Sequence, residues 1–184
     1  MNYSVSPLAK ADLDQLPSFL QVVISDTFKQ DNIDNPLDEV EEIENKLASM
    51  KASCQPENTE TLYLVAKSQP EDNIIGTIAY SKPNQLIKDH LKIDLSEVPE
   101  VSSVLILPTS QGQGIGSALF KKILELLKQR QVKSFCLDGG YIKSQGFWIK
   151  KLGKPDVVLT DYYGKGRPYM IWHRDVTSIL EKNS

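Results

Sequence analysis

Hydrophobic residues recur at helical spacing in two segments near the start of the chain. The first segment covers about 12–28, with Pro17 in its first turn, and its apolar positions are Leu13, Leu16, Leu20, Ile24 and Phe28. The second follows Asn35, a favourable N-cap, and Pro36, which suits the first helical position. Its apolar positions are Val40, Ile43, Leu47 and Met50. Two amphipathic helices are therefore predicted.

Strand-like runs follow the second of these helices. Residues 61–67 and 74–81 are rich in strand-forming side chains, and the turn residues of 68–73 join them, which predicts a hairpin. A third strand over about 101–107 ends at Pro108. Between them, 83–99 mixes apolar and charged residues and fits either a surface helix or a loop over the site.

The clearest helix of the chain is predicted over about 114–129. Its apolar stripe consists of Ile115, Leu119, Ile123, Leu126 and Leu127. A strand over 132–137, a helix over 143–152 closed by Gly153, and strands over 156–160 and 169–173 complete the chain. This order predicts an α/β fold, in which a mixed sheet carries helices on both faces.

Composition and charge favour an ordinary globular protein. A chain of 184 residues with 40% hydrophobic and 24% charged residues predicts a single domain over 1–184. The net charge of −3 argues against nucleic-acid and membrane partners. No signal pattern or membrane-length apolar run occurs, so we expect a cytoplasmic protein. The two cysteines, Cys54 and Cys136, and the two histidines, His90 and His173, are isolated, which predicts neither a disulfide framework nor a metal site.

The candidate chemistry lies in the glycine-rich segment 104–117. Glycines at 112, 114 and 116 allow backbone N–H groups to converge on an anion, and the following helix adds its N-terminal donors and its positive dipole end. This arrangement suits a pyrophosphate. The alternative is a tight strand-to-helix turn without a ligand.

Two other nucleotide-binding motifs fit less well. A Walker A loop requires a lysine before its final hydroxyl residue, whereas Gly116 precedes Ser117. A dinucleotide-binding fold is favoured by the spacing of Gly112 and Gly114 and by Asp138 at the end of the next strand. However, Ser117 occupies the third glycine position, and only 46 residues follow Asp138. We therefore reject both motifs.

Gln111, Gly114 and Gly116 match the Gln/Arg-x-x-Gly-x-Gly/Ala signature of the GNAT-type N-acetyltransferases, which the chain resembles over nearly its whole length. The signature follows a strand ending Ile106-Leu107-Pro108 and opens a long helix, as in that family. Segments 135–141 and 169–172 further resemble a bacterial subgroup. The resemblance implies the GNAT fold, with a central, mostly antiparallel sheet between helices.

The resemblance also implies a binding site for acetyl-CoA and no metal. The pyrophosphate would be held by backbone N–H groups of Gln111, Gly112, Gln113, Gly114, Ile115, Gly116 and Ser117. The pantetheine arm would pair with the strand backbone at Leu105, Ile106 and Leu107. An amide near Ile106 would polarise the thioester carbonyl.

The proton-transfer residues are predicted less directly. Counting back from Pro108, Glu100 falls where many family members carry the glutamate base. The usual tyrosine acid is missing, because Trp148 stands at or beside its position. An indole N–H is not a usable acid. Tyr141, at a strand end, is the preferred substitute, and the other candidates are Tyr162, Tyr163 and Cys136.

The predicted function is acetyl-CoA-dependent transfer of an acetyl group to a primary amine of a small molecule or peptide. The alternative is a non-catalytic acyl-CoA-binding or sensing domain on the same fold, because fold alone does not fix function. A monomer or homodimer is expected.

Overall fold

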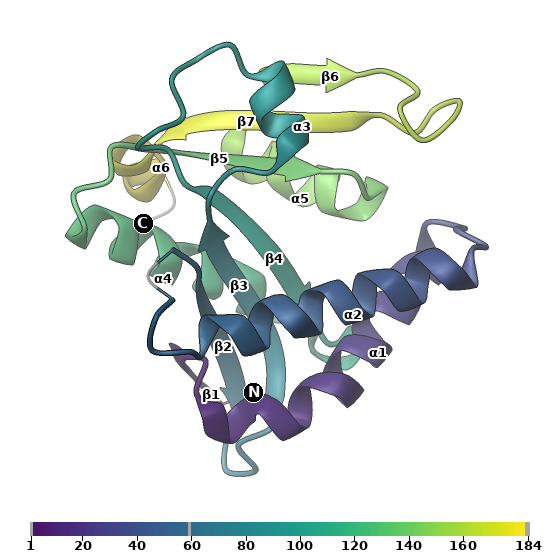
Figure 1. Ribbon diagram of the computed structural model, residues 1–184, viewed down its shortest axis with the longest axis vertical. Coiled ribbons are helices and arrows are strands. Elements are labelled where there is room, and N and C mark those ends of the chain that lie inside the picture. Colours follow the sequence, from purple (N-terminus) through teal and green to yellow (C-terminus); the bar gives the residue numbers. More distant parts are fainter. Residues whose placement is uncertain (1, 59, 183–184) are drawn as a thin grey trace. The chain divides into compact units, whose positions relative to one another are not determined.

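Seven strands form one sheet in the computed structural model, which describes residues 2–58 and 60–182 (Figure 1). The strands are β1 (Tyr3–Pro7), β2 (Leu62–Ser68), β3 (Ile74–Ser81), β4 (Glu100–Ile106), β5 (Ser134–Gly139), β6 (Val157–Leu159) and β7 (Tyr169–Asp175). The α-helices are α1 (Leu16–Gln30), α2 (Pro36–Ser53), α3 (Gln85–His90), α4 (Ile115–Gln129), α5 (Ile142–Leu152) and α6 (Val176–Lys182). The pairs β1–β2, β5–β7 and β6–β7 are antiparallel, and β4–β5 is parallel. The predicted mixed, mostly antiparallel sheet is confirmed.

The chain divides into two compact units. Unit 1 comprises residues 1–79 and 103–123, and unit 2 comprises 80–102 and 124–184. The strand order is β1-β2-β3-β4-β5-β7-β6, and β3, β4 and α4 contribute residues to both units. In the described residues no helix is both long and apolar enough to cross a membrane.

Helix α2 begins as the sequence predicts, whereas α1 begins at Leu16, about one turn after the predicted start near residue 12. The side chain of Asn35 accepts hydrogen bonds from the N–H groups of Leu37 and Asp38, and Pro36 opens α2. A 3-10 helix, η1 (Lys10–Gln15), leads into α1, whose first turn contains Pro17. The buried stripe of α1 is Leu16, Phe19, Leu20, Val23, Ile24 and Phe28. Val40, one of the apolar positions that predicted this helix, is 52% exposed.

Strand β3 is buried on both of its faces within unit 1, since every residue from Ile74 to Ala79 is buried. A Cβ atom at Gly76 would lie 2.7 Å from Cδ1 of Ile106 and 3.2 Å from Cγ2 of Ile115. Glycine at this position therefore lets the end of β4 and the start of α4 approach β3 closely.

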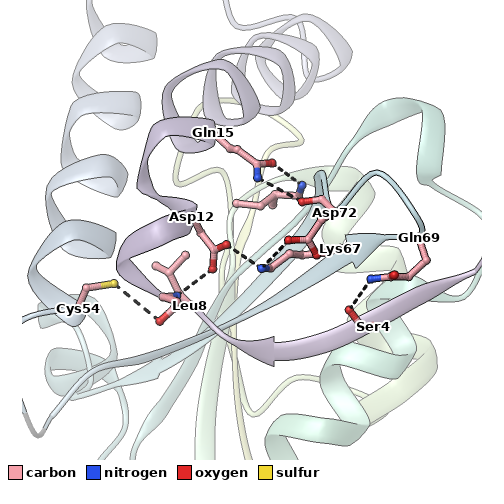
Figure 2. Close-up of polar contacts among 10 residues, drawn as sticks. Ser4, Leu8, Asp12, Gln15, Cys54, Lys67, Gln69 and Asp72 are labelled. Atoms are coloured by element: carbon pink, nitrogen blue, oxygen red, sulfur yellow. Dashed lines mark hydrogen bonds and ion pairs between the residues drawn. The ribbon is translucent and has the colours of Figure 1, made fainter.

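A polar network fixes η1 against the β2–β3 hairpin in unit 1 (Figure 2). The carboxylate of Asp12 forms an ion pair with Lys67 Nζ at 2.7 Å and accepts the N–H of Ala9 at 2.9 Å. The side chain of Gln15 accepts the N–H of Ile74 at 2.9 Å. These contacts use charged and polar side chains to join segments about 55 residues apart in the sequence.

In unit 2, the segment 83–99, for which the sequence allowed either a helix or a loop, contains α3, which packs against β5. Its central residue, Ile87, is fully buried. The cluster around it consists of Leu91, Val98, Cys136, Tyr169 and Ile171. Among the described strands and α-helices, the edge strand β1 and the C-terminal helix α6 were not predicted.

Candidate active site

The turn between β4 and α4 has the backbone shape that an anion-binding loop requires. After the short 3-10 turn Pro108–Ser110, Gly112 and Gly114 adopt φ values of +74° and +82°. Side-chain-bearing residues rarely adopt this left-handed conformation. A Cβ at either glycine would meet nothing within 4 Å, and both residues are exposed. Glycine at these two positions therefore allows the left-handed backbone conformation and keeps the turn open, and it is not required by close packing.

Helix α4 supplies further donors at this turn. The first hydrogen bond with the i to i−4 spacing of an α-helix runs from the N–H of Ala118 to the carbonyl of Gly114 at 3.0 Å. The N–H groups of Ile115, Gly116 and Ser117 precede that bond and have no acceptor within the helix. They point, with the positive end of the helix dipole, toward the exposed turn. The turn can thus bind a phosphate group.

The strand before the turn carries two peptide groups with assigned partners. The N–H of Leu107 donates to the carbonyl of Ile75 at 3.0 Å, so it is committed to β3. Because successive peptide groups of a strand alternate in direction, the N–H of Ile106 points to the opposite edge. Gln111 Nε2 donates to the Ile106 carbonyl at 3.2 Å, which ties the signature glutamine to the strand end.

Strand β4 has an irregular residue in its middle. Ser103 has a φ of +53°, a left-handed conformation that interrupts the extended backbone as in a β-bulge. The hydroxyl of Thr77 donates to the Ser103 carbonyl at 2.9 Å, and Lys46 Nζ donates to the Ser103 hydroxyl at 3.2 Å. Bulges of this kind re-aim the backbone that follows them.

Glu100, the predicted base, is the first residue of β4 and belongs to unit 2. Its side chain is buried, with 6% exposure. The parallel register sets Glu100 opposite Cys136 of β5. The N–H of Asn84 donates to Glu100 Oε2 at 2.7 Å. Such a charge-assisted bond orients the carboxylate.

A second carboxylate, Asp138, lies in the same network. Residues 136 and 138 share one face of β5, because side chains alternate along a strand. Oδ2 of Asp138 accepts hydrogen bonds from Nδ2 of Asn84 and from the hydroxyl of Tyr169. Burial and the charge of Asp138 raise the pKa of Tyr169, so this phenol keeps its proton. Sequence reasoning missed Asn84 and Tyr169, since only the β5–β7 register and the position of α3 bring them together.

The sequence matches the model of one protein family. The acetyltransferase (GNAT) family matches residues 26–153, which is more than half of the chain. The chain belongs to the GNAT family. Membership identifies it as an N-acetyltransferase. A sequence search finds no match among curated proteins.

Solved GNAT structures share the fold at low sequence identity. The PaiA N-acetyltransferase from Thermoplasma acidophilum, solved with coenzyme A, has a TM-score of 0.67 and 16% identity, covering 95% of this chain and 99% of its own. The ribosomal-protein-S18-alanine N-acetyltransferase from Escherichia coli has a TM-score of 0.63 and 13% identity, covering 95% and 94%. A spermidine N-acetyltransferase chimera built from Vibrio cholerae SpeG and hSSAT has a TM-score of 0.62 and 14% identity, covering 98% and 99%.

The GNAT signature residues lie in the turn after β4 and Glu100 opens β4, and their roles stay predictions. Tyr141 is the N-cap of α5, and its carbonyl accepts hydrogen bonds from Ser144 Oγ at 2.8 Å and the N–H of Gln145 at 3.0 Å. These are contacts of the main chain of Tyr141. Its role as the acid of the GNAT reaction stays a prediction.

The other candidates for the acid differ in exposure. Burial, together with the charges of Glu100 and Asp138, raises the pKa of Cys136 to about 12, which makes its thiol a poor acid at neutral pH. Tyr162 and Tyr163 are 44% and 50% exposed.

The departure from the GNAT pattern at Trp148 has a structural basis. Trp148 is buried, with 4% exposure, and its ring meets that of Phe147 edge to face at 4.8 Å. Trp148 therefore packs in the interior of unit 2. In the described part of the chain, no group of three or more histidine, cysteine, aspartate or glutamate residues could hold a metal ion.

Proposed function

We propose that the chain transfers the acetyl group of acetyl-CoA directly to a primary amine of a small molecule or peptide. The observation that carries this proposal is the turn after β4, where two left-handed glycines precede the N-terminus of α4 in a GNAT-family chain. A pyrophosphate is the ligand that such a turn suits best. The coenzyme A bound by the T. acidophilum protein is consistent with this donor.

The pyrophosphate, the pantetheine arm and the thioester of acetyl-CoA each have assigned residues in the proposal. The N–H groups from Gly112 to Ser117 bind the pyrophosphate, because that of Gln111 donates to the Pro108 carbonyl at 3.3 Å. The backbone of Leu105 and Ile106 pairs with the pantetheine arm. Leu107 is assigned no pairing here, because its N–H donates to Ile75 and its carbonyl accepts the N–H of Ser110 at 2.8 Å. The N–H of Ile106 donates to the thioester oxygen and stabilises the negative charge that develops there.

Glu100 takes the proton of the acceptor amine. An alkyl amine with a pKa of about 10.4 is neutral to only about 0.04% at pH 7, so reaching its nucleophilic form costs roughly 4.6 kcal/mol. The amine nitrogen then forms a bond to the acetyl carbonyl carbon, the carbon–sulfur bond breaks, and the thiolate leaves with the electron pair. The thiolate takes a proton from Tyr141, and the nitrogen loses its second proton through solvent to the Tyr141 phenolate as the amide forms. Glu100 releases its proton to solvent, and the products are the N-acetyl amine and coenzyme A.

The names of the similar structures span both kinds of acceptor. One of these proteins is a spermidine N-acetyltransferase, and another is a ribosomal-protein-S18-alanine N-acetyltransferase. Both kinds of acceptor are amines, which supports the reaction class proposed for this chain. Neither name selects between a small molecule and a peptide.

Binding of coenzyme A tests the first half of the proposal. Gly114→Ala places a Cβ on a left-handed residue at about 1–2 kcal/mol of backbone strain, so we expect the Kd for coenzyme A to rise about 10-fold or more in calorimetry. Gly153→Ala is the matched control: Gly153 closes α5 with a φ of +80°, and its substitution leaves the Kd unchanged. Wild-type protein without saturable affinity for any coenzyme A species would refute the proposal.

Turnover tests the second half. Release of coenzyme A is measured with a panel of amines, and Glu100→Gln is expected to remove the acidic limb of the pH–rate profile. An unchanged profile rules Glu100 out, and unaltered turnover of Tyr141→Phe rules Tyr141 out. Tight binding without release on any amine favours instead a non-catalytic acyl-CoA-binding domain, which the tryptophan at 148 makes a specific alternative.

Three further parts of the proposal concern the protein as a whole. We propose that residues 1–184 act as one domain, that the protein is a monomer or a homodimer, and that it works in the cytoplasm without nucleic acid or membrane partners. Light scattering of the purified protein distinguishes the two oligomeric states.

A further inference from the structure

Asn84 connects three elements of unit 2 through three different polar groups. Its side-chain oxygen accepts the N–H of Ile87 at 3.0 Å and so caps α3. Its backbone N–H donates to Glu100 at 2.7 Å. Its side-chain amide donates to Asp138. A single residue therefore joins α3, the first residue of β4 and the end of β5.

Glu100 and Tyr169 are enclosed by the fold, whereas Asn84 and Asp138 are half-buried. Glu100 is 6% exposed, and Tyr169, which also donates to Asp138, is 6% exposed. Ile87 of α3 is fully buried in the cluster that includes Cys136 and Tyr169. The N-terminus of α3 is thus fixed by apolar packing as well as by the two carboxylates, and a fixed N-terminus presents the Asn84 N–H to Glu100 in one geometry.

We propose that Asn84 is a positioning residue for the acetyl transfer, which holds Glu100 in place through its backbone N–H while its side chain is anchored on Asp138. This inference rests on the proposed role of Glu100 as the base. Asn84 itself touches neither substrate nor reacting atoms. Its effect is on the orientation and proton affinity of the Glu100 carboxylate.

The electrostatic surroundings of Glu100 determine the sign of the expected effect. Among the described residues, Cys136 on β5 and Tyr169 on β7 interact electrostatically with Glu100, and the carboxylate of Asp138 acts on the same two groups. Tyr163, from the loop before β7, adds its charge effect at Tyr169. A new negative charge or a lost donor in this network disfavours the ionised form of Glu100 and raises its pKa.

Asn84→Asp separates the positioning role from the capping role. Aspartate caps a helix as well as asparagine and has nearly the same shape, but it replaces the donor to Asp138 with a second carboxylate. We expect the acidic limb of kcat/KM to move to higher pH by about one unit and kcat/KM below pH 7 to fall about 10-fold. The matched control is Asn35→Asp in the cap of α2, which leaves the profile where it is in the wild type.

The exchange of partners supplies a second readout that does not need activity. In Asn84→Asp/Asp138→Asn an amide again faces a carboxylate, so we expect the double variant to recover most of the Tm lost by Asn84→Asp alone. Asn84→Ser, which keeps a capping oxygen but lacks the amide, serves where Asn84→Asp folds poorly. It is expected to shift the limb in the same direction by a smaller amount.

The possible results separate this proposal from the one beneath it. Suppose that Glu100→Gln removes the acidic limb of the kcat/KM profile but Asn84→Asp leaves it in place. This result would overturn the positioning role of Asn84, while Glu100 would remain the base. A limb that Glu100→Gln leaves in place removes the base assignment and the positioning role together. A double variant no more stable than Asn84→Asp refutes the link between Asn84 and Asp138.

Discussion

Two aspartates, the buried Asp12 in unit 1 and the half-buried Asp138 in unit 2, have partners of different kinds. Asp12 is 2% exposed, and the ammonium group of Lys67 lies 2.7 Å from its carboxylate (Figure 2). Asp138 is half-buried, and its hydrogen bonds in the described residues come from two neutral groups, the amide of Asn84 and the phenol of Tyr169.

The difference shows what each aspartate contributes. A lysine cancels the charge of Asp12, so the pair acts locally and joins η1 to β2. Neutral donors orient Asp138 but leave its full negative charge in the network that contains Glu100. We therefore expect substitutions at the first site to change stability, and substitutions at the second to change the pH dependence of the reaction.

The largest expected effect is that of Lys67→Met. The substitution leaves the buried Asp12 carboxylate without its cation, so the free energy of unfolding is expected to fall by about 3–5 kcal/mol in urea denaturation. Lys51→Met, on the exposed side of α2, is the control, and we expect a change within about 0.5 kcal/mol. A Lys67→Met variant as stable as the control would show that the ion pair contributes nothing.

The same pair predicts a dependence of stability on alkaline pH. The hydrogen bond to Asp12 is the main cause that raises the pKa of Lys67 above its ordinary value of 10.5. A raised lysine pKa means that the stabilisation is complete below about pH 10 and is lost as pH rises through the folded-state pKa. The stability difference between wild type and Lys67→Met should accordingly shrink above pH 10.5 in parallel urea titrations. A difference that stays constant to pH 12 would contradict this.

Tyr169→Phe is expected to have a smaller effect on stability. The ring and its packing stay, but Asp138 loses one of its two donors, which lowers the free energy of unfolding by about 1.5 kcal/mol. Thermal unfolding measures the change. Tyr162→Phe, at a 44% exposed ring, provides the comparison and should leave Tm unaltered. Equal Tm values for the two variants would show that the hydrogen bond from Tyr169 to Asp138 does not contribute to stability.

Asp138→Asn should change stability least. The amide oxygen can still accept from Tyr169 and Asn84, so we expect less than about 1 kcal/mol of destabilisation. The loss of a negative charge near Glu100 lowers the pKa of that base, and the acidic limb of kcat/KM moves to lower pH. A limb that stays in place, or moves upward, would show that the charge of Asp138 does not act on Glu100.

Local signals predicted the parts of the fold that depend on neighbours in the sequence. Asn35 and Pro36 determine the start of α2 by themselves, and Gly153 ends α5 with a left-handed φ, so both boundaries could be predicted. The edge strand β1 has only five residues, and α6 has seven, which is too short for a periodic signal to stand out. Val40 follows the helical period but is exposed. The period predicts which residues share one face of the helix, but it does not predict which other element covers that face.

The candidate site was predictable to the extent that it consists of backbone. The glycine turn follows from residue types alone, since positive φ values favour glycine. Asn84 and Tyr169 lie 54 and 31 residues from Asp138 in the sequence, and nothing in their local pattern indicates a shared carboxylate. Such contacts depend on sheet register and on the packing of α3, which are tertiary properties.

The left-handed Ser103 has a consequence for counting along β4. Successive peptide groups of a strand point alternately to its two edges. One extra residue therefore reverses the edge that each later peptide group of the strand faces. Three residues after Ser103, the N–H of Ile106 therefore has the direction that the irregular residue sets. Deleting one residue between 103 and 106 would exchange the edges that the amides of Ile106 and Leu107 face, without altering any side chain of the turn that follows.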